Sequence, residues 1–159
     1  MINSELELLL MKQVAHELLN SNKYRVCKSW LRKEGYEGLS KFFDSNYKDE
    51  LSHAEMIQSF IEDRNCLVNI PAIEEVSVKF NTVLDIALFA MDTEVDTTRK
   101  LSDIMIMAQE CNDFMCQELM FRMLKEQVEE EDKIQTLIDR VMKAEDENNM
   151  LVVDTIYGG

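Results

Sequence analysis

The segment DELSH (residues 49–53) carries a Glu-x-x-His pair, Glu50 with His53, and it follows Glu17 at an interval of 33 residues. On an α-helix, residues three apart lie on one face, so this carboxylate and this imidazole project in the same direction. Helix bundles hold two metal ions with such pairs and with single Glu residues from neighbouring helices. This part of the chain therefore predicts two adjacent helices that share a metal-binding face.

The second half of the chain carries a similar set. Glu94 is followed, again after 33 residues, by Gln127, and Glu130 lies three positions further on. If each position lies on its own helix, four helices bring carboxylate, amide and imidazole groups to one point inside a bundle. Such ligands suit Fe(II) and Fe(III), whereas copper and zinc clusters favour thiolates. The two sets predict an all-α four-helix bundle with a non-haem di-iron site.

Length and composition agree with a helical domain. The chain has 159 residues, 46% of them apolar, which is enough to bury one core, and we expect a single domain over residues 1–159. One Pro and four Gly leave few breakers, and no Gly lies between positions 39 and 157. The expected helices span about 5–33, 39–64, 82–109 and 114–144, with a short fifth helix at 147–157.

The segment 66–81, which surrounds Pro71, breaks the helical pattern. Sixteen extended residues reach about 50 Å, whereas a 27-residue helix is about 40 Å long. This connection can therefore run the length of the bundle, so we expect a long crossover that makes the second and third helices parallel. Gly35 and Gly38 are expected to bracket the turn between the first two helices.

The apolar residues that recur at helical spacing also predict which side chains are buried. A carboxylate such as Glu17 in the middle of an apolar stripe is costly unless it is paired or metal-bound. His16 has no evident partner and is expected to face solvent. The third helix is expected to bury Leu84, Ala87, Met91, Thr98, Leu101 and Met105 together with Glu94.

Charge and cysteine usage limit the partners and the compartment. The chain has 31 acidic and 17 basic residues, a net charge of −14, which argues against a nucleic-acid partner and suits cations. The four Cys form no C-x-x-C pair, so we expect free thiols in a reducing, cytoplasmic environment. The first residues do not read as a signal peptide, and no apolar run is long enough to span a membrane.

The chain resembles a bacterial-type non-haem ferritin over nearly all of its length. The resemblance is carried by Glu17, Tyr24, Trp30, the EG at 37–38, DELSH at 49–53, Glu94, EQVEEE at 126–131, the crossover with its Pro and the apolar C-terminal stretch. It implies a homo-oligomer, a hollow shell of twenty-four subunits. It also implies ferroxidase activity, in which Fe(II) is oxidised by O₂ or H₂O₂ and stored as Fe(III) mineral, with no haem.

The resemblance also implies roles for single residues. Glu17, Glu50 and His53 would hold the first iron, with Glu50 bridging to a second iron. The remaining positions are Glu94 and Gln127 for the second iron, Glu130 as a further acidic ligand, Asp49, Glu126 and Glu129 for an accessory third site, and Tyr24 as the site tyrosine. Position 49 is Asp where the family more often has Glu, which shortens the reach of the third site.

Other functions remain open from the sequence. A bacterioferritin would carry a second Glu-x-x-His pair and a haem-ligating Met in the second helix, where position 52 is Ser. A DNA-protecting mini-ferritin would place its irons between subunits, and a rubrerythrin would add a Cys₄ module. A di-iron oxygenase or oxidase with an organic substrate would keep two symmetric Glu-x-x-His pairs, and a di-iron oxidase that does not store iron is a further alternative. A metal-free helical shell or adaptor protein could keep the family residues without activity.

Overall fold

The computed structural model describes residues 1–158, so Gly159, the last residue of the expected domain, lies outside the described residues. The described part contains five helices: α1 (Ser4–Lys33), α2 (Glu37–Asp63), α3 (Val83–Glu110), α4 (Phe114–Lys143) and α5 (Glu147–Gly158). It has no strand, which confirms the all-α class, and the helix ends lie within two residues of those expected. None of these described helices has the length and apolar character that a membrane crossing requires.

Side chains at the starts of several helices accept hydrogen bonds from backbone N–H groups that have no partner within the helix. The Asn3 side chain accepts from Glu5 N and Leu6 N at the start of α1. Thr82 and Asp85 form a reciprocal capping box at the start of α3. Tyr36, which precedes α2, offers no such side-chain bond. The start of α2 therefore needs a partner from elsewhere in the chain.

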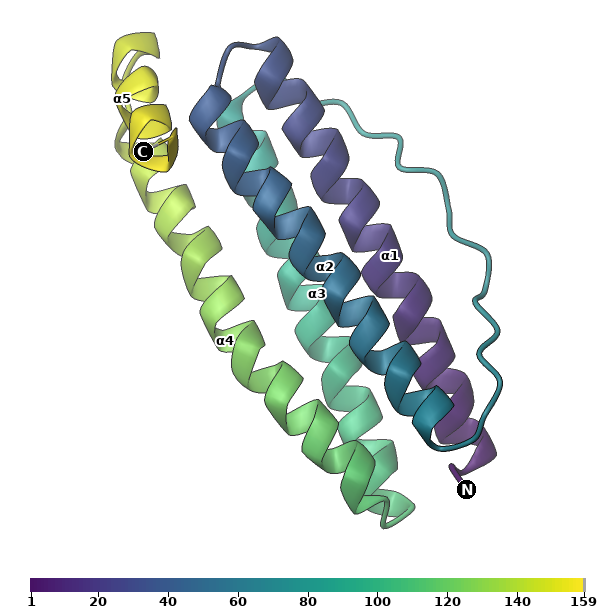
Figure 1. Cartoon of the computed structure of the whole chain (residues 1–159). Coiled ribbons are helices and arrows are strands. Elements are labelled where there is room, and N and C mark those ends of the chain that lie inside the picture. Colours follow the sequence, from purple (N-terminus) through teal and green to yellow (C-terminus); the bar gives the residue numbers. More distant parts are fainter. Residues whose placement is uncertain (159) are drawn as a thin grey trace.

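The long helices form a bundle of two antiparallel pairs, α1 with α2 and α3 with α4, joined by one long crossover (Figure 1). α1 packs along α2, α3 packs along α4, and α1 also contacts α3. The segment between α2 and α3 runs beside α1 from one end of the bundle to the other, so α2 and α3 run in the same direction (Figure 1). The crossover topology expected from the length of this segment is confirmed.

A buried polar layer divides the core into two apolar clusters. One cluster contains residues from the first part of α1, the last part of α2, the end of α3 and the start of α4, and the other contains the opposite ends of the same helices. The layer between them comprises Gln13, His16, Glu17, Asn20, Ser21, Asn46, Glu50, His53, Thr93, Glu94, Thr97 and Gln127. Since all four long helices contribute, this layer lies across the middle of the bundle.

The buried face of α3 differs in part from the expected stripe. Ala87 and Leu101 are buried as expected, whereas Leu84, Met91, Thr98 and Met105 are only partly buried. The fully buried positions include Ile86, Ala90, Thr93, Thr97 and Ile104. α3 packs against both α1 and α4, so its buried face is wider than one stripe and is centred on other residues.

Gly38 lies inside α2 and not in the preceding turn, which corrects the expectation for this residue. A Cβ at Gly38 would collide with main-chain atoms of Asp154 and Gly158, so the missing side chain lets α5 lie against α2. The Asp154 carboxylate accepts a 2.7 Å hydrogen bond from Leu39 N. α5 therefore supplies the cap that the start of α2 lacks. Gly35, with φ +88°, is the residue that the turn requires.

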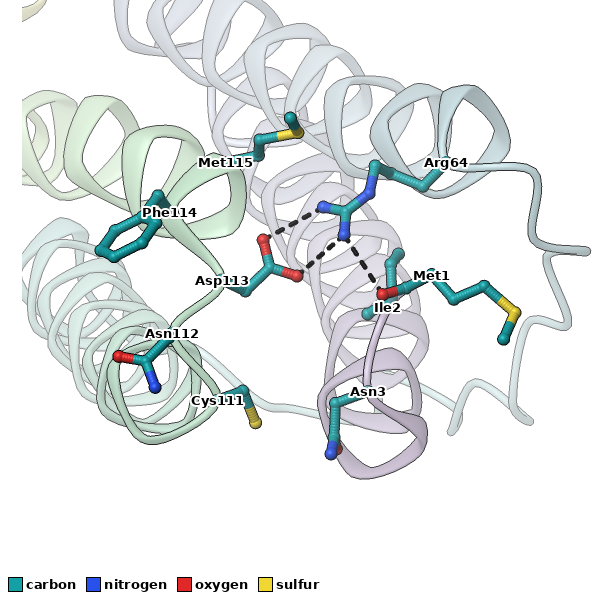
Figure 2. Close-up of a pocket in the computed structure, with 9 residues that line it drawn as sticks. All are labelled: Met1, Ile2, Asn3, Arg64, Cys111, Asn112, Asp113, Phe114 and Met115. Carbon is teal, nitrogen blue, oxygen red and sulfur yellow. Dashed lines mark hydrogen bonds and ion pairs between the residues drawn. The ribbon is translucent and has the colours of Figure 1, made fainter.

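The opposite end of the bundle is held by an ion pair between α2 and α4 (Figure 2). Both guanidinium Nη atoms of Arg64 donate to the Asp113 carboxylate, at 3.1 and 3.0 Å. The same carboxylate caps α4 by accepting from Cys116 N at 3.0 Å. Burial works to raise the pKa of Asp113, but these hydrogen bonds outweigh it and hold the pKa below its ordinary value.

Replacement of Asp113 should separate its two roles. We expect Asp113→Ala, which loses cap and ion pair, to lower the free energy of unfolding by about 2–4 kcal/mol. Asp113→Asn keeps a capping oxygen and should cost only about 1–2 kcal/mol. Because the folded-state pKa is depressed, the stabilisation by Asp113 should be complete at neutral pH and should disappear as the pH falls through that pKa. Urea unfolding at several pH values measures this pH dependence, with Asp139→Ala, at an exposed position, as the control. An equal loss of unfolding free energy in Asp113→Ala at all pH values would contradict the prediction.

Candidate metal centre

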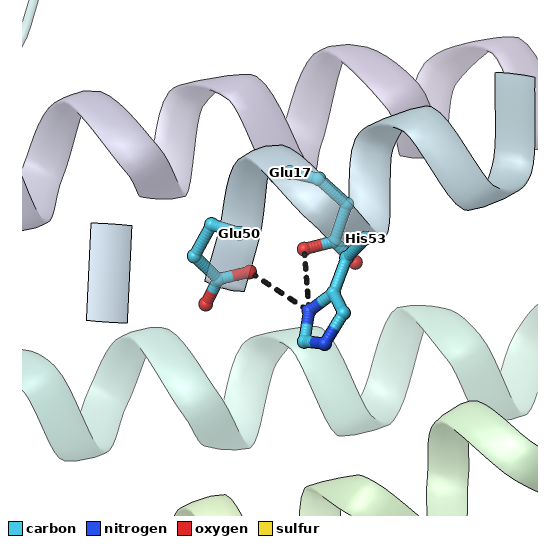
Figure 3. A group of neighbouring side chains, drawn as sticks. All are labelled: Glu17, Glu50 and His53. Carbon is cyan, nitrogen blue, oxygen red and sulfur yellow. Dashed lines mark hydrogen bonds and ion pairs between the residues drawn. The ribbon is translucent and has the colours of Figure 1, made fainter. Parts of the chain in front are cut away.

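Three side chains from α1 and α2 form the centre of the polar layer (Figure 3). Glu17, Glu50 and His53 each offer one ligand atom, and these atoms lie within 4.8 Å of one another. His53 Nδ1 lies 3.3 Å from Glu50 Oε2 and 3.9 Å from Glu17 Oε2. The one-face spacing of positions 50 and 53 thus directs both side chains toward α1, as the helical periodicity predicts.

The other two helices supply an adjoining group of polar side chains. The Tyr24 hydroxyl of α1 donates to the Glu94 carboxylate of α3. Gln127 of α4 donates through Nε2 to Glu94 Oε2 at 3.0 Å and also lies 3.3 Å from Thr98 Oγ1. The second sequence set, Glu94 and Gln127, is therefore brought together next to the first. The Gln127 amide holds the Glu94 carboxylate in place without adding charge.

The buried carboxylates of the two groups disfavour one another's ionised forms. Burial raises the pKa of Glu17 well above its ordinary value, and the negative charge of Glu50 raises it further. Burial raises the pKa of Glu50 to about 8, and the negative charges of Glu94 and Glu130 act in the same direction. Burial also raises the pKa of Glu94. A cation among these groups would compensate their charge.

One atom of this cluster indicates directly that the site suits a cation. Glu17 Oε2 is buried and has no hydrogen-bond partner, while Oε1 accepts from Gln13 Nε2 at 3.0 Å. A buried acceptor without a donor is costly, and a metal ion is one partner that a carboxylate oxygen accepts without a proton. Carboxylates with one imidazole form a ligand set that suits iron. The residues present therefore fit the metal that the sequence predicts.

The remaining sequence-predicted acids lie at the edge of the layer. The Glu126 carboxylate accepts a 2.9 Å hydrogen bond from His53 Nε2, and the Glu126 side chain is 47% exposed. Glu130 is nearer the interior, with its side chain 15% exposed, and pairs with Lys133 at 2.8 Å. Asp49 is partly buried and Glu129 is exposed. These four acids occupy the α2/α4 side of the bundle and not the central cluster.

The polar layer contains a histidine network that sequence reasoning missed. His16 is buried, which corrects the expectation that it faces solvent, and its Nε2 lies 3.0 Å from Thr97 Oγ1. Since the Thr97 hydroxyl donates to Thr93 O, His16 Nε2 must donate to Thr97 Oγ1. His16 Nδ1 then accepts from Lys100 Nζ at 2.9 Å. Burial and the Lys100 charge lower the pKa of His16 to about 4, so the ring is neutral at neutral pH.

Gln13 is a second residue that the sequence patterns did not single out. Its side chain is buried, and it binds Glu17 as described. Gln13 and Glu17 are four residues apart, and His16 and Asn20 have the same spacing, so these pairs share faces of α1. Polar side chains repeated at helical spacing around a buried carboxylate are the signal that could have identified them.

The raised carboxyl pKa values predict how the metal-free protein responds to pH. The folded state then binds more protons than the unfolded state, so the free energy of unfolding should fall as the pH rises from the ordinary glutamate value of 4.5 toward the Glu50 pKa of about 8. A redox-inert divalent cation such as Co(II) should remove this decrease. Urea midpoints measured over this pH range with and without Co(II) test the prediction. Glu50→Gln should make the midpoint of the metal-free protein depend less on pH. A metal-free midpoint that rises over this range would contradict the electrostatic account.

Comparisons with known proteins agree with this architecture. The family model of the ferritin-like domain matches residues 7–144. The bacterial non-heme ferritin of Staphylococcus aureus (strain USA300) is 27% identical over 151 residues, which cover 95% of this chain and 91% of that protein. The protein of the same description from Staphylococcus epidermidis is also 27% identical over 151 residues.

Solved structures share the fold. An open pore ferritin from the hyperthermophilic archaeon Archaeoglobus fulgidus superimposes with a TM-score of 0.96 at 23% identity, over 99% of this chain and 98% of that one. An engineered closed form of the A. fulgidus ferritin gives a TM-score of 0.95, with 99% and 97% of the two chains covered. These likenesses confirm the four-helix bundle with a short fifth helix. Because the family model matches most of its length, the chain belongs to the ferritin-like domain family.

Proposed function

We propose that this protein is an iron-storage ferritin that oxidises Fe(II) at a di-iron ferroxidase centre inside each subunit. The observation that carries the proposal is the buried Glu17 oxygen without a hydrogen-bond donor, within a cluster of two carboxylates and one imidazole. Membership of the ferritin-like family and the likeness to bacterial non-heme ferritins support the same function. Iron is here both the substrate and the stored product.

The two groups of side chains divide the ligands between two iron positions. Glu17 and His53 would bind the first Fe(II), and Glu50, whose pKa is affected by both Glu17 and Glu94, would bridge to the second. Glu94 and Gln127 would complete the second position. Because Gln127 is neutral, this position carries less negative charge, which weakens its hold on Fe(III) and lets the product leave for the store. A permanent cofactor would have no need of such an exit.

The chemistry requires two electrons to be delivered together. Two Fe(II) ions give one electron each to O₂, which takes up two protons and leaves as H₂O₂, so that no radical is released. With H₂O₂ as oxidant, the same two electrons and two protons give two molecules of water. The protein's own part is to hold both ions at one place and to exclude bulk water. Tyr24 fixes the Glu94 carboxylate by its hydrogen bond.

The acids at the α2/α4 edge would lead iron to and from the centre. Asp49, Glu126, Glu129 and Glu130 would form the accessory third site. Glu126 links this site to the centre because its carboxylate binds the outer nitrogen of His53. A concentration of negative charge attracts Fe(II) and raises its local concentration. The shorter side chain of Asp49 limits its reach, so Glu130 and Glu126 would carry most of the binding.

The storage role requires a closed homo-oligomer, for which we propose the twenty-four-subunit shell. Exposed apolar side chains on the bundle surface support an assembly, because large apolar residues exposed in rows mark contact surfaces. On α4, Phe114, Phe121 and Val128 are each more than 60% exposed and recur every seven residues, so they lie on one side of that helix. On α5, Leu151, Val152 and Ile156 are also exposed.

Aerobic addition of Fe(II) to the metal-free protein tests the proposed function. We expect rapid oxidation, with several hundred Fe(III) ions per shell staying soluble and bound to protein, measured by absorbance and by iron analysis after centrifugation. Oxidation that stops near two ions per chain, with precipitation of the rest, would instead identify a di-iron oxidase without a store. No acceleration over buffer would indicate a metal-free shell or adaptor protein and would overturn the proposal.

Substitutions of single ligands test the assigned roles. Glu50→Ala and His53→Ala should each slow the first turnover by about 10²-fold or more, since removal of one catalytic electrostatic group commonly costs that much. Glu129→Ala and Glu130→Ala should leave the first turnover near the parent rate and slow later ones. Glu118→Ala, an exposed acid on the same helix as these two, is the matched control. Parent-like rates in the His53 or Glu50 variant would refute the assignment of the centre.

A further inference from the structure

We propose that the hollow between α1 and α3 is the binding and entry site for the neutral oxidant, O₂ or H₂O₂, and that it is separate from the acidic α2/α4 side that takes Fe(II). The proposal rests on the ferroxidase function proposed above and adds the position where its second substrate enters. The hollow has a volume of about 250 Å³ and is lined by Leu9, Lys12, Gln13, His16, Lys100, Asp103 and Ile104.

A specific entrance is needed because the centre is closed off from solvent. Glu17 is 0% exposed, and the other side chains of the central cluster and of the Glu94 group are buried as well. Two sides of the polar layer approach the surface. One is the α2/α4 side, where Glu126 contacts His53, and the other is the α1/α3 side, where the hollow lies.

One side chain separates the hollow from a proposed iron ligand. Gln13 lines the hollow although it is only 2% exposed, so it forms part of the floor. Its amide donates to Glu17 Oε1 at 3.0 Å. A rotation of the Gln13 side chain about its own bonds, which breaks its hydrogen bond to Glu17, would connect the hollow with the Glu17 carboxylate. Gln13 therefore acts as a gate and not as a ligand.

The lining of the hollow suits a small neutral molecule and not a cation. Leu9 and Ile104 provide apolar walls, which favour uptake of O₂ from water. Lys12 and Lys100 place two ammonium groups at the rim. The one lining carboxylate, Asp103, and the nearby Asp96 share Arg99, and Asp96 also pairs with Lys100, so the charge of Lys12 leaves this region with an excess of positive charge. Fe(II) would meet positive charge here, whereas an uncharged oxidant would meet no electrostatic barrier.

The His16 network fixes the side chains on this side of the polar layer. His16 lines the hollow, donates to Thr97 and accepts from Lys100, so neither ring nitrogen is free to bind iron. Lys100 is also held by Asp96 at 3.0 Å. The wall of the hollow thus contains a histidine that is saturated with hydrogen bonds. On the opposite side, His53 faces two carboxylates of the cluster and Glu126.

Substitutions of Leu9, which lines the hollow and is not a proposed iron ligand, test the proposal by filling or widening the hollow. The protein is loaded anaerobically with two Fe(II) per chain and mixed with limiting or excess O₂ in a stopped-flow instrument. We expect Leu9→Trp to slow oxidation at low O₂ by about tenfold, as an added entry barrier of about 1.4 kcal/mol would. The maximal rate at saturating O₂ should change little. Leu9→Ala should oxidise at least as fast as the parent.

Two further variants separate blockage from other effects. Leu8→Trp adds the same bulk at an exposed neighbouring position, and it should behave like the parent. Lys12→Glu reverses a rim charge and should leave anaerobic Fe(II) binding unchanged, because Fe(II) does not enter here. Repeating the mixing with H₂O₂ shows whether the hollow serves O₂ alone or both oxidants, and slowing of either by Leu9→Trp supports the proposal.

The outcomes that overturn the proposal differ from those that overturn the function. Parent-like O₂ dependence in Leu9→Trp would show that the oxidant enters elsewhere. Equal slowing in both Leu9 variants would show that damage to packing, not blockage, sets the rate. Faster anaerobic Fe(II) binding in Lys12→Glu would make the hollow an iron entrance. If the parent itself binds no Fe(II) without O₂, the ferroxidase function fails before the entrance is tested.

Discussion

The burial of three carboxylates in the middle of a helix bundle is the constraint on which the rest of this structure depends. Glu17, Glu50 and Glu94 are each at most 4% exposed, and taking ionised carboxylates out of water costs several kcal/mol each. In the metal-free state this cost appears as raised pKa values. A bundle can maintain such a layer only if the apolar clusters on both sides of it are large and well packed.

The ends of the helices show how that requirement is met. At one end, α5 lies against Gly38 and caps the start of α2 with Asp154. At the other, Arg64 joins the end of α2 to the start of α4 through Asp113. These contacts lie at the outer limits of the two apolar clusters, where helices would otherwise fray. The polar layer is thus held between two fixed ends, which keeps the side chains of the candidate metal centre in place.

The sequence was sufficient for the fold because its signals were local and repeated. The 33-residue interval that links Glu17 to Glu50, and Glu94 to Gln127, placed one polar residue on each of four helices, and the length of segment 66–81 predicted the crossover. The sequence could not show that His16 is buried, since its partners Thr97 and Lys100 lie more than eighty residues away. It could not assign Gly38 either, because the reason for that glycine is the main chain of α5.

The composition of the polar layer shows that metal binding alone does not account for it. A layer built only for two ions would need the ligands and their direct partners, yet His16, Asn20 and Thr97 extend it to the α1/α3 surface. Their hydrogen bonds to one another contribute little net stability compared with apolar packing of similar volume. The two sides of the layer also differ in sign, with acids beside His53 and lysines beside His16. Under the function proposed above, such an asymmetric layer would keep a cation and a neutral oxidant apart.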